Sequence, residues 1–151
     1  MFRSLLLLAI AVIPALSADA QVGSSTLTLP EGWTAATAQD TTTLVAPHKT
    51  PHIQVRILAK PAPEVQAAVA ALIVDQVKDF TVAKTETITL GKHAAVRLTG
   101  TGTEADDGDP SNVEITVMAM GASSVLVISH GEGKGTAERS AALAEILATL
   151  H

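Results

Sequence analysis

Residues 112–130 read NVEITVMAMGASSVLVISH, and this stretch decides the fold. Val113, Ile115, Val117 and Ala119 alternate with Glu114, Thr116, Met118 and Met120. This period of two, with β-branched residues, is the pattern of a strand that needs one covered face. Gly121 to Ser124 are small or turn-forming residues that suit a hairpin. Val125–Ile128 follow and are apolar at every position. Because a continuously apolar strand needs cover on both faces, we expect residues 125–128 to lie in the middle of a sheet.

Two amphipathic segments are able to supply that cover. Residues Glu64–Phe80 follow two prolines, which suit the start of a helix. Residues 137–150 form a second predicted helix, with Thr136 as its cap. Each carries an apolar stripe at three- to four-residue spacing. The stripes consist of Val65, Val69, Leu72, Val77 and Phe80 in the first helix, and of Leu143, Ile146, Leu147 and Leu150 in the second.

The remaining strands are predicted from shorter alternating runs. We expect strands over residues 24–30 (an edge strand), 41–46, 53–57, 82–90 and 94–98, and loops over residues 35–40 and 100–110. Strands that follow one another closely in the chain favour antiparallel pairing. The predicted fold is therefore α+β, with a mainly antiparallel sheet of six or seven strands and a helix on each face.

The N-terminal segment, residues 1–20, has the three parts of a bacterial signal peptide. Arg3 is the positive region, Leu5–Ile13 is an apolar core too short to span a bilayer, and Ala18-Asp19-Ala20 is a small-x-small cleavage site. Cleavage after Ala20 leaves one α+β domain over residues 21–151. We expect this domain to be periplasmic or secreted, with no membrane attachment after cleavage.

Composition excludes several classes of function. The chain of 151 residues has a net charge of −5, and its ten basic residues are scattered, which argues against binding to nucleic acid. It has no cysteine, so disulfides and thiolate sites are excluded. Phe2, Trp33 and Phe80 are its only aromatic residues, too few for a stacking platform. We predict no cofactor, no resident metal and no catalytic residue.

The histidines offer the main alternative. His48 and His52 are four residues apart, but neighbouring prolines make a helix there unfavourable. His93 and His130 lie at a strand start and a strand end, and they would approach Glu132 if their strands were neighbours. No HExxH spacing indicates zinc, so we interpret these histidines as surface residues.

Two loops resemble ligand sites without matching them. Residues 104–109 hold four carboxylates, but the ligand spacing of a calcium loop and its closing glutamate are missing. Residues 131–136, GEGKGT, precede a helix as phosphate loops do, yet Gly135 separates Lys134 from the hydroxyl residue that a P-loop needs next to it. We interpret the first as a solvated hairpin loop and the second as a flexible turn before a helix.

The order of elements resembles that of the PsbP/Mog1-like α/β/α sandwich family, including its small secreted bacterial members. The matching features are LPEGW at residues 29–33, GKHAAVRL at 91–98, the long hairpin, and EILATL at 145–150. The resemblance implies a noncatalytic accessory or binding domain, and it carries no shared catalytic residues. The lack of tyrosine is a departure from the family pattern.

Three functions follow as hypotheses. The first is an exported accessory or binding domain that acts through a protein partner. The second is a metal-dependent or hydrolytic enzyme that uses His52, His93 and His130. The third is a periplasmic immunity or inhibitor protein. For the first, the candidate contact rim consists of Trp33, Lys92, His93, Glu132 and Lys134.

Overall fold

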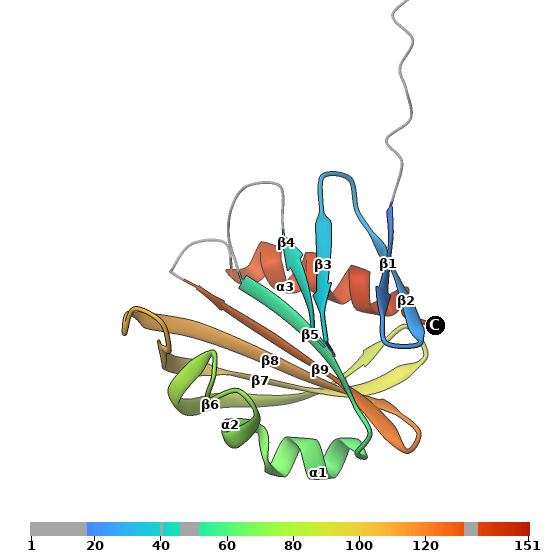
Figure 1. Cartoon of the computed structure of the whole chain (residues 1–151). Coiled ribbons are helices and arrows are strands. Elements are labelled where there is room, and N and C mark those ends of the chain that lie inside the picture. Colours follow the sequence, from blue (N-terminus) through green and yellow to red (C-terminus); the bar gives the residue numbers. More distant parts are fainter. Residues whose placement is uncertain (1–17, 40, 46–51, 132–135) are drawn as a thin grey trace, which may run out of the picture.

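The computed structural model describes residues 18–39, 41–45, 52–131 and 136–151, with the backbone alone at residues 52 and 136–139. Figure 1 shows a curved sheet with helices packed on it. The strands are β1 (Ala18–Val22), β2 (Ser25–Leu29), β3 (Thr34–Ala38), β4 (Thr41–Val45), β5 (His52–Leu58), β6 (Val77–Leu90), β7 (His93–Glu104), β8 (Pro110–Met120) and β9 (Ser123–Gly131). The helices are α1 (Ala62–Ala67), α2 (Val69–Leu72) and α3 (Thr136–Ala148).

The main sheet has seven strands in the order β3-β4-β5-β9-β8-β7-β6, and every neighbouring pair is antiparallel. β9 is the middle strand, as the run of apolar residues predicts. Its residues Val125–Ile128 are completely buried. The prediction of an antiparallel sheet of six or seven strands is confirmed. β1 and β2 form a separate two-stranded sheet.

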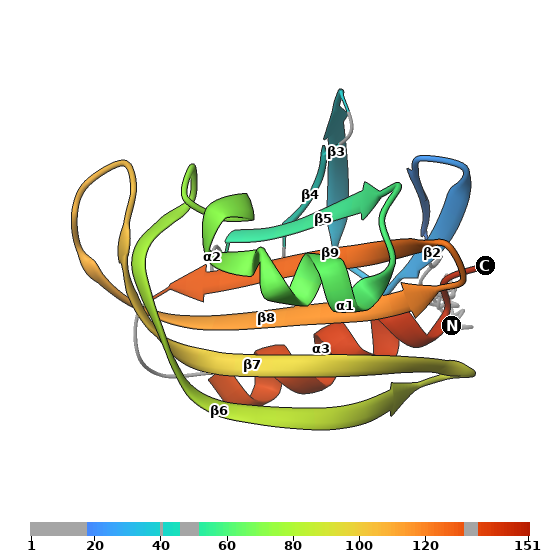
Figure 2. The same cartoon turned by 90° about the horizontal axis from the view of Figure 1, so that it is seen from below.

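The two faces of β9 lie in different hydrophobic cores. Val125 and Val127 belong to a core with the apolar stripe of α3, in which Leu143, Ile146, Leu147 and Leu150 are all buried. Leu126 and Ile128 belong to a second core with Val65 of α1 and Val69 of α2. Figure 2 shows α1 and α2 in front of the sheet and α3 behind it. The predicted helix on each face is therefore confirmed.

The predicted helix over residues 64–80 is wrong in its second half. α1 ends at Ala67, α2 ends at Leu72, and β6 begins at Val77. The amides of Gln76 and Val77 both donate to the carbonyl of Ile73, at 2.8 Å each, and this turn leads the chain into the sheet. Val77 thus stays buried, as the helical stripe predicted, but it lies in a strand that pairs with β7.

Two predictions near the N-terminus need correction. Residues 35–40 were expected to be a loop, yet β3 pairs with β4 over its whole length. Residues 24–30 were expected to form an edge strand of the sheet, but β2 lies outside it and pairs with β1. β2 also contacts the end of the chain, because Thr26 and His151 exchange two backbone hydrogen bonds of 3.0 and 3.3 Å. The β1–β2 pair thereby extends the layer formed by α3.

β1 includes the three residues expected to end the signal peptide. Ala18, Asp19 and Ala20 pair with Leu29, Thr28 and Leu27, and Ala20 is only 6% exposed. We expect a chain that begins at Gln21 to be less stable than one that begins at Ala18 by roughly 1–3 kcal/mol, through lost strand pairs and lost burial. Urea denaturation of the two chains measures the difference. Equal midpoints would show that residues 18–20 contribute nothing to the stability.

Candidate functional site

Trp33 follows a tight turn between β2 and β3. The Trp33 amide donates to the Pro30 carbonyl at 3.2 Å, and Gly32 has a φ of +80°, which favours glycine. The indole is partly buried against the core that also contains α3. The turn therefore places the indole where β1, β2 and β3 meet.

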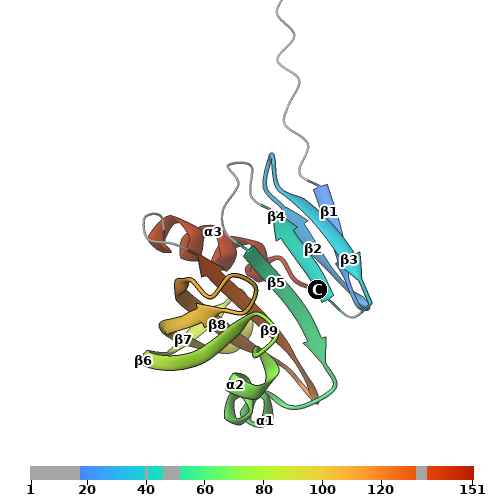
Figure 3. The same ribbon diagram turned by 60° about the vertical axis from the view of Figure 1, so that its left-hand side comes forward.

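A groove of about 380 Å³ lies beside Trp33, between β1 and β3. Figure 3 shows the β1–β2 pair against the β3 side of the sheet. At one end of the groove the Gln21 carbonyl accepts hydrogen bonds from the Thr37 and Thr42 hydroxyls, at 3.4 and 3.2 Å. The lining residues are Ala18, Asp19, Ala20, Gln21, Leu29, Trp33, Thr34, Ala35 and Thr37. Asp19 is the only charged residue among them.

A second cavity, of about 200 Å³, lies at the end of the sheet where β9 finishes. Asp75, Gln76, Asp106 and His130 line it. The His130 side chain is 6% exposed, and its Nδ1 lies 3.2 Å from Oε1 of Glu104, whose side chain is 14% exposed. This pair ties the end of β9 to the end of β7.

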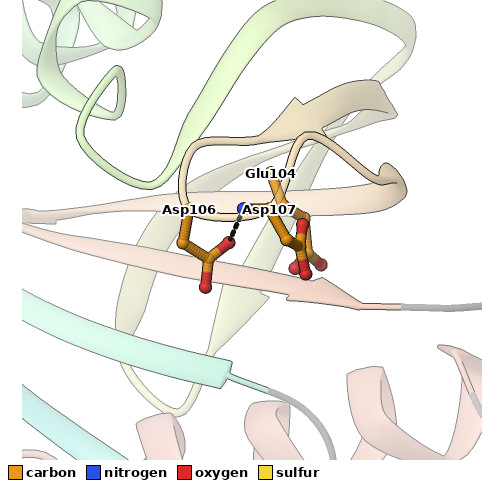
Figure 4. A group of neighbouring side chains, drawn as sticks. All are labelled: Glu104, Asp106 and Asp107. Atoms are coloured by element: carbon orange, nitrogen blue, oxygen red, sulfur yellow. Dashed lines mark hydrogen bonds between the residues drawn. The ribbon is translucent and has the colours of Figure 1, made fainter.

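The acidic loop lies beside this second cavity. Carboxylate oxygens of Glu104, Asp106 and Asp107 lie within 4.8 Å of one another, and Figure 4 shows the three side chains. The Asp106 carboxylate accepts the Asp107 amide at 2.9 Å, and the Asp107 carboxylate accepts the Asp109 amide at 3.0 Å. The second of these bonds is that of an ordinary Asx turn. Asp106 and Asp107 are exposed apart from these contacts, as a solvated hairpin loop requires.

The condition for an approach of His93 to His130, that their strands are neighbours, is not met. β8 separates β7 from β9. The register also places the two histidines at opposite ends of the sheet, because Ala95 lies opposite Met118 whereas His130 lies opposite Val113. His52 is the backbone partner of His130, but its side chain lies outside the described residues.

The five residues of the predicted contact rim do not form one described surface. Trp33 adjoins the β3 edge, whereas Lys92 and His93 lie at the turn between β6 and β7, at the other edge of the sheet. That turn packs on α3: a Cβ added at Gly91 would lie 2.9 Å from the Ala148 carbonyl oxygen. Glu132 and Lys134 lie outside the described residues.

A buried polar contact below α3 escaped the sequence analysis. The Glu114 side chain is 5% exposed, it accepts a hydrogen bond from the Ser140 hydroxyl, and its Oε1 lies 3.7 Å from the Arg97 Nε. Glu114 alternates with the apolar residues of β8, so the sequence pattern predicts that its side chain faces solvent. The helix that covers this face comes from 26 residues further along the chain, so the strand pattern alone carried no signal.

Comparison with known proteins defines the class of fold. No protein-family model matches the sequence, and no curated protein is similar to it. The structure is similar to that of the cyanobacterial PsbP protein of Synechocystis, with a TM-score of 0.59, 11% identity, and coverage of 93% of this chain and 95% of that one. It is also similar to Mog1, with a TM-score of 0.56, 12% identity, and coverage of 90% and 95%.

Two further solved structures have the same architecture. LpqN of Mycobacterium tuberculosis, described as involved in cell envelope biogenesis, gives a TM-score of 0.59 at 13% identity, with 89% of each chain covered. A protein of Bacteroides thetaiotaomicron gives a TM-score of 0.58 at 10% identity. The match covers 84% of this chain but only 44% of that longer one. The chain therefore has a PsbP/Mog1-like fold, as the sequence resemblance implied. In the described part of the chain no helix is both long and apolar enough to cross a membrane.

Proposed function

We propose that this chain is an exported periplasmic accessory domain that acts by binding a protein partner and has no catalytic activity of its own. The leader-like sequence at the N-terminus supports export. Because Ala18, Asp19 and Ala20 pair with β2 and line the groove described above, the proposal places the cleavage ahead of Ala18 and not after Ala20. The PsbP/Mog1-like fold supports the accessory role, since LpqN, of the same architecture, is described as involved in cell envelope biogenesis.

The observation that carries the proposal is the groove beside Trp33. Large aromatic side chains at the border of a concave surface are the residues that most often anchor protein contacts. Trp33 is the only tryptophan of the chain, and it lies at a groove of about 380 Å³ that is bordered by an exposed strand. Most side chains that line the groove are small or uncharged, so removing water from them when a partner binds costs little free energy.

Recovery of the partner is the direct experiment. The tagged protein, expressed in its own host and purified from the cell envelope under mild conditions, is expected to retain a partner at a fixed stoichiometry. A wild-type preparation that never retains a stoichiometric protein would contradict the proposal.

Replacement of Trp33 tests the contact surface. We expect Trp33→Ala to lower partner recovery about tenfold, because loss of an aromatic anchor commonly costs more than 1 kcal/mol of binding energy. Lys92→Ala, at the opposite edge of the sheet, is the matched control and should retain the partner. Circular dichroism melts of both variants separate a loss of binding from a loss of folding. If Lys92→Ala lost the partner and Trp33→Ala kept it, the β6–β7 turn would be the contact surface.

A second candidate, a metal-dependent or hydrolytic enzyme, is favoured by one observation. His130, Glu104 and Asp106 gather at the cavity of about 200 Å³, where imidazole and carboxylate groups are common metal ligands. Elemental analysis after mild purification distinguishes the two candidates. We expect sub-stoichiometric zinc, copper and calcium, whereas one ion per chain, lost in His130→Ala, would favour the enzyme. The inhibitor hypothesis shares the binding proposal, and a toxin or protease as the recovered partner would select it.

A further inference from the structure

β3 is an open edge of the main sheet. It is the terminal strand, so one side of its backbone pairs with no strand in the described part of the chain. Its sequence, TAATA, contains no charge and no proline, and all five of its residues are exposed. The register with β4 is continuous from Thr34 to Ala38. Such an edge presents unpaired N–H and C=O groups that accept another strand.

The opposite edge strand, β6, carries the features that prevent such pairing. Its register with β7 shifts at two places, and Asp79 has a φ of +54°. Lys84 and Glu86 form an ion pair of 2.8 Å on it. The pKa of Glu86 lies below its ordinary value because the Lys84 side chain donates a hydrogen bond to it, with the positive charges of Lys84 and Arg97 adding to the effect. Bulges and charges of this kind block strand addition, and β3 has neither.

The groove beside β3 adds side-chain selectivity to this edge. Thr34, Ala35 and Thr37 of β3 form one wall, and Leu29 and Trp33 supply apolar surface. The one charge in the lining is the carboxylate of Asp19, which accepts the Thr28 hydroxyl at 3.2 Å and has no basic residue beside it in the lining. A segment seated here would combine backbone pairing along β3 with an apolar contact and a positive charge.

We propose that β3 binds an extended segment of the partner protein as an eighth strand of the sheet. Alternate side chains of that segment enter the groove, an apolar one contacts Trp33, and a lysine or arginine lies near Asp19. This inference rests on the proposed function and names the kind of contact through which the partner is held. The mode is strand addition, in which backbone hydrogen bonds supply affinity and alternate side chains supply selectivity.

A second copy of this chain fits the edge less well. Five residues of strand extend only about 17 Å, and pairing of two β3 strands would leave the groove unfilled. A stable protein interface usually buries about 1,200 Å² or more, so an edge this short needs the additional groove contacts that a peptide segment supplies.

The test uses a displayed library of random linear ten-residue peptides, panned against the chain that begins at Ala18, which keeps Asp19 and the β1 wall of the groove. We expect the enriched peptides to be rich in β-branched residues and to contain a lysine or arginine. Amide hydrogen exchange with the tightest peptide should slow in β3 and not in β6.

Ala35→Lys places a positive charge on the groove wall. It is expected to weaken binding of the peptide by about tenfold or more, because like charges repel across an interface. Ala35→Asp should bind about as well as the wild type.

Ala83→Lys is the matched control, since Ala83 is an exposed alanine of the opposite edge strand. It should leave peptide binding unchanged. If Ala35→Lys melts well below the wild type, Thr34→Lys replaces it, because Thr34 is also exposed and lines the groove.

Four results would overturn the inference: no enriched peptide, protection outside β3, an equal loss of binding in Ala83→Lys, or a concentration-dependent dimer that Ala35→Lys abolishes. The last would assign the edge to a second copy. Failure here is distinct from failure of the proposed function. A partner that copurifies equally with Ala35→Lys refutes strand addition and leaves the accessory role intact, whereas a wild-type protein without any partner refutes the role itself.

Discussion

Val127→Asp is expected to prevent stable folding. Val127 is completely buried in the middle strand of the sheet and contributes to the core below α3. The substitution removes a buried aliphatic side chain, which costs roughly 1.5–3 kcal/mol. It also adds a buried carboxylate, which costs several kcal/mol more, because Arg97 on the same face lies two strands away and is already beside Glu114. The sum approaches the whole stability of a typical domain, about 5–15 kcal/mol. Circular dichroism during heating and in urea measures it.

Val82→Asp is the matched control for this substitution. Val82 lies on the edge strand β6 and is 44% exposed, so its replacement by aspartate buries no charge. We expect its stability to remain within about 1 kcal/mol of the wild type, as for most surface substitutions. A Val127→Asp protein that melted together with Val82→Asp would show that the centre of the sheet is not packed as described.

Gly100→Ala is expected to cost about 2–3 kcal/mol or more, within or above the usual range for overpacking. A Cβ at Gly100 would overlap the Thr81 carbonyl oxygen and would lie 3.1 Å from the Val82 Cα. Both obstacles are backbone atoms of β6, so they are unable to move aside without breaking the pairing of Val82 with Gly100. The midpoint of urea denaturation reports the loss.

Gly121→Asn provides the control for the glycine substitution. Gly121 lies in the β8–β9 turn with a φ of +70°, and a Cβ there would meet no atom within 4 Å. Asparagine tolerates this backbone conformation, so a change of less than about 1 kcal/mol is expected. If Gly100→Ala lowered the stability no more than Gly121→Asn does, β6 would not lie as close to β7 as the structure shows.

Residues 72–90 show where the sequence pattern was ambiguous. Leu72, Val77 and Phe80 belong to the apolar stripe that predicts a helix, but all three also lie in or against the core below α1 when residues 77–90 form a strand. Short apolar spacings fit either element, and only pairing with β7 distinguishes them. The pairing partner lies up to 27 residues away, at Glu104, which is beyond the range of a local pattern.

The candidate site was predicted less completely than the fold. Trp33 was singled out from composition, and it borders the larger groove. The other wall of that groove comes from β1, which the sequence assigned to the signal peptide, and from β3, which it assigned to a loop. Threonine favours strands, but alanine does not, and TAATA shows no alternation of apolar and polar residues. The local signal for β3 is therefore weak, and its pairing with β4 defines the strand. The cavity at His130 likewise needed the ends of three separate elements to meet.

By itself the sequence determined the central β8–β9 hairpin, the helix α3 with its buried stripe, and the two-sided cover of β9, because strong local periodicity leaves one way to bury so many apolar residues. Only the tertiary structure decided that residues 77–90 are a strand, that β1 and β2 leave the main sheet, and that β3 ends it with an open edge. These features depend on backbone pairing between segments far apart in the chain, and such pairing leaves little trace in the order of side chains.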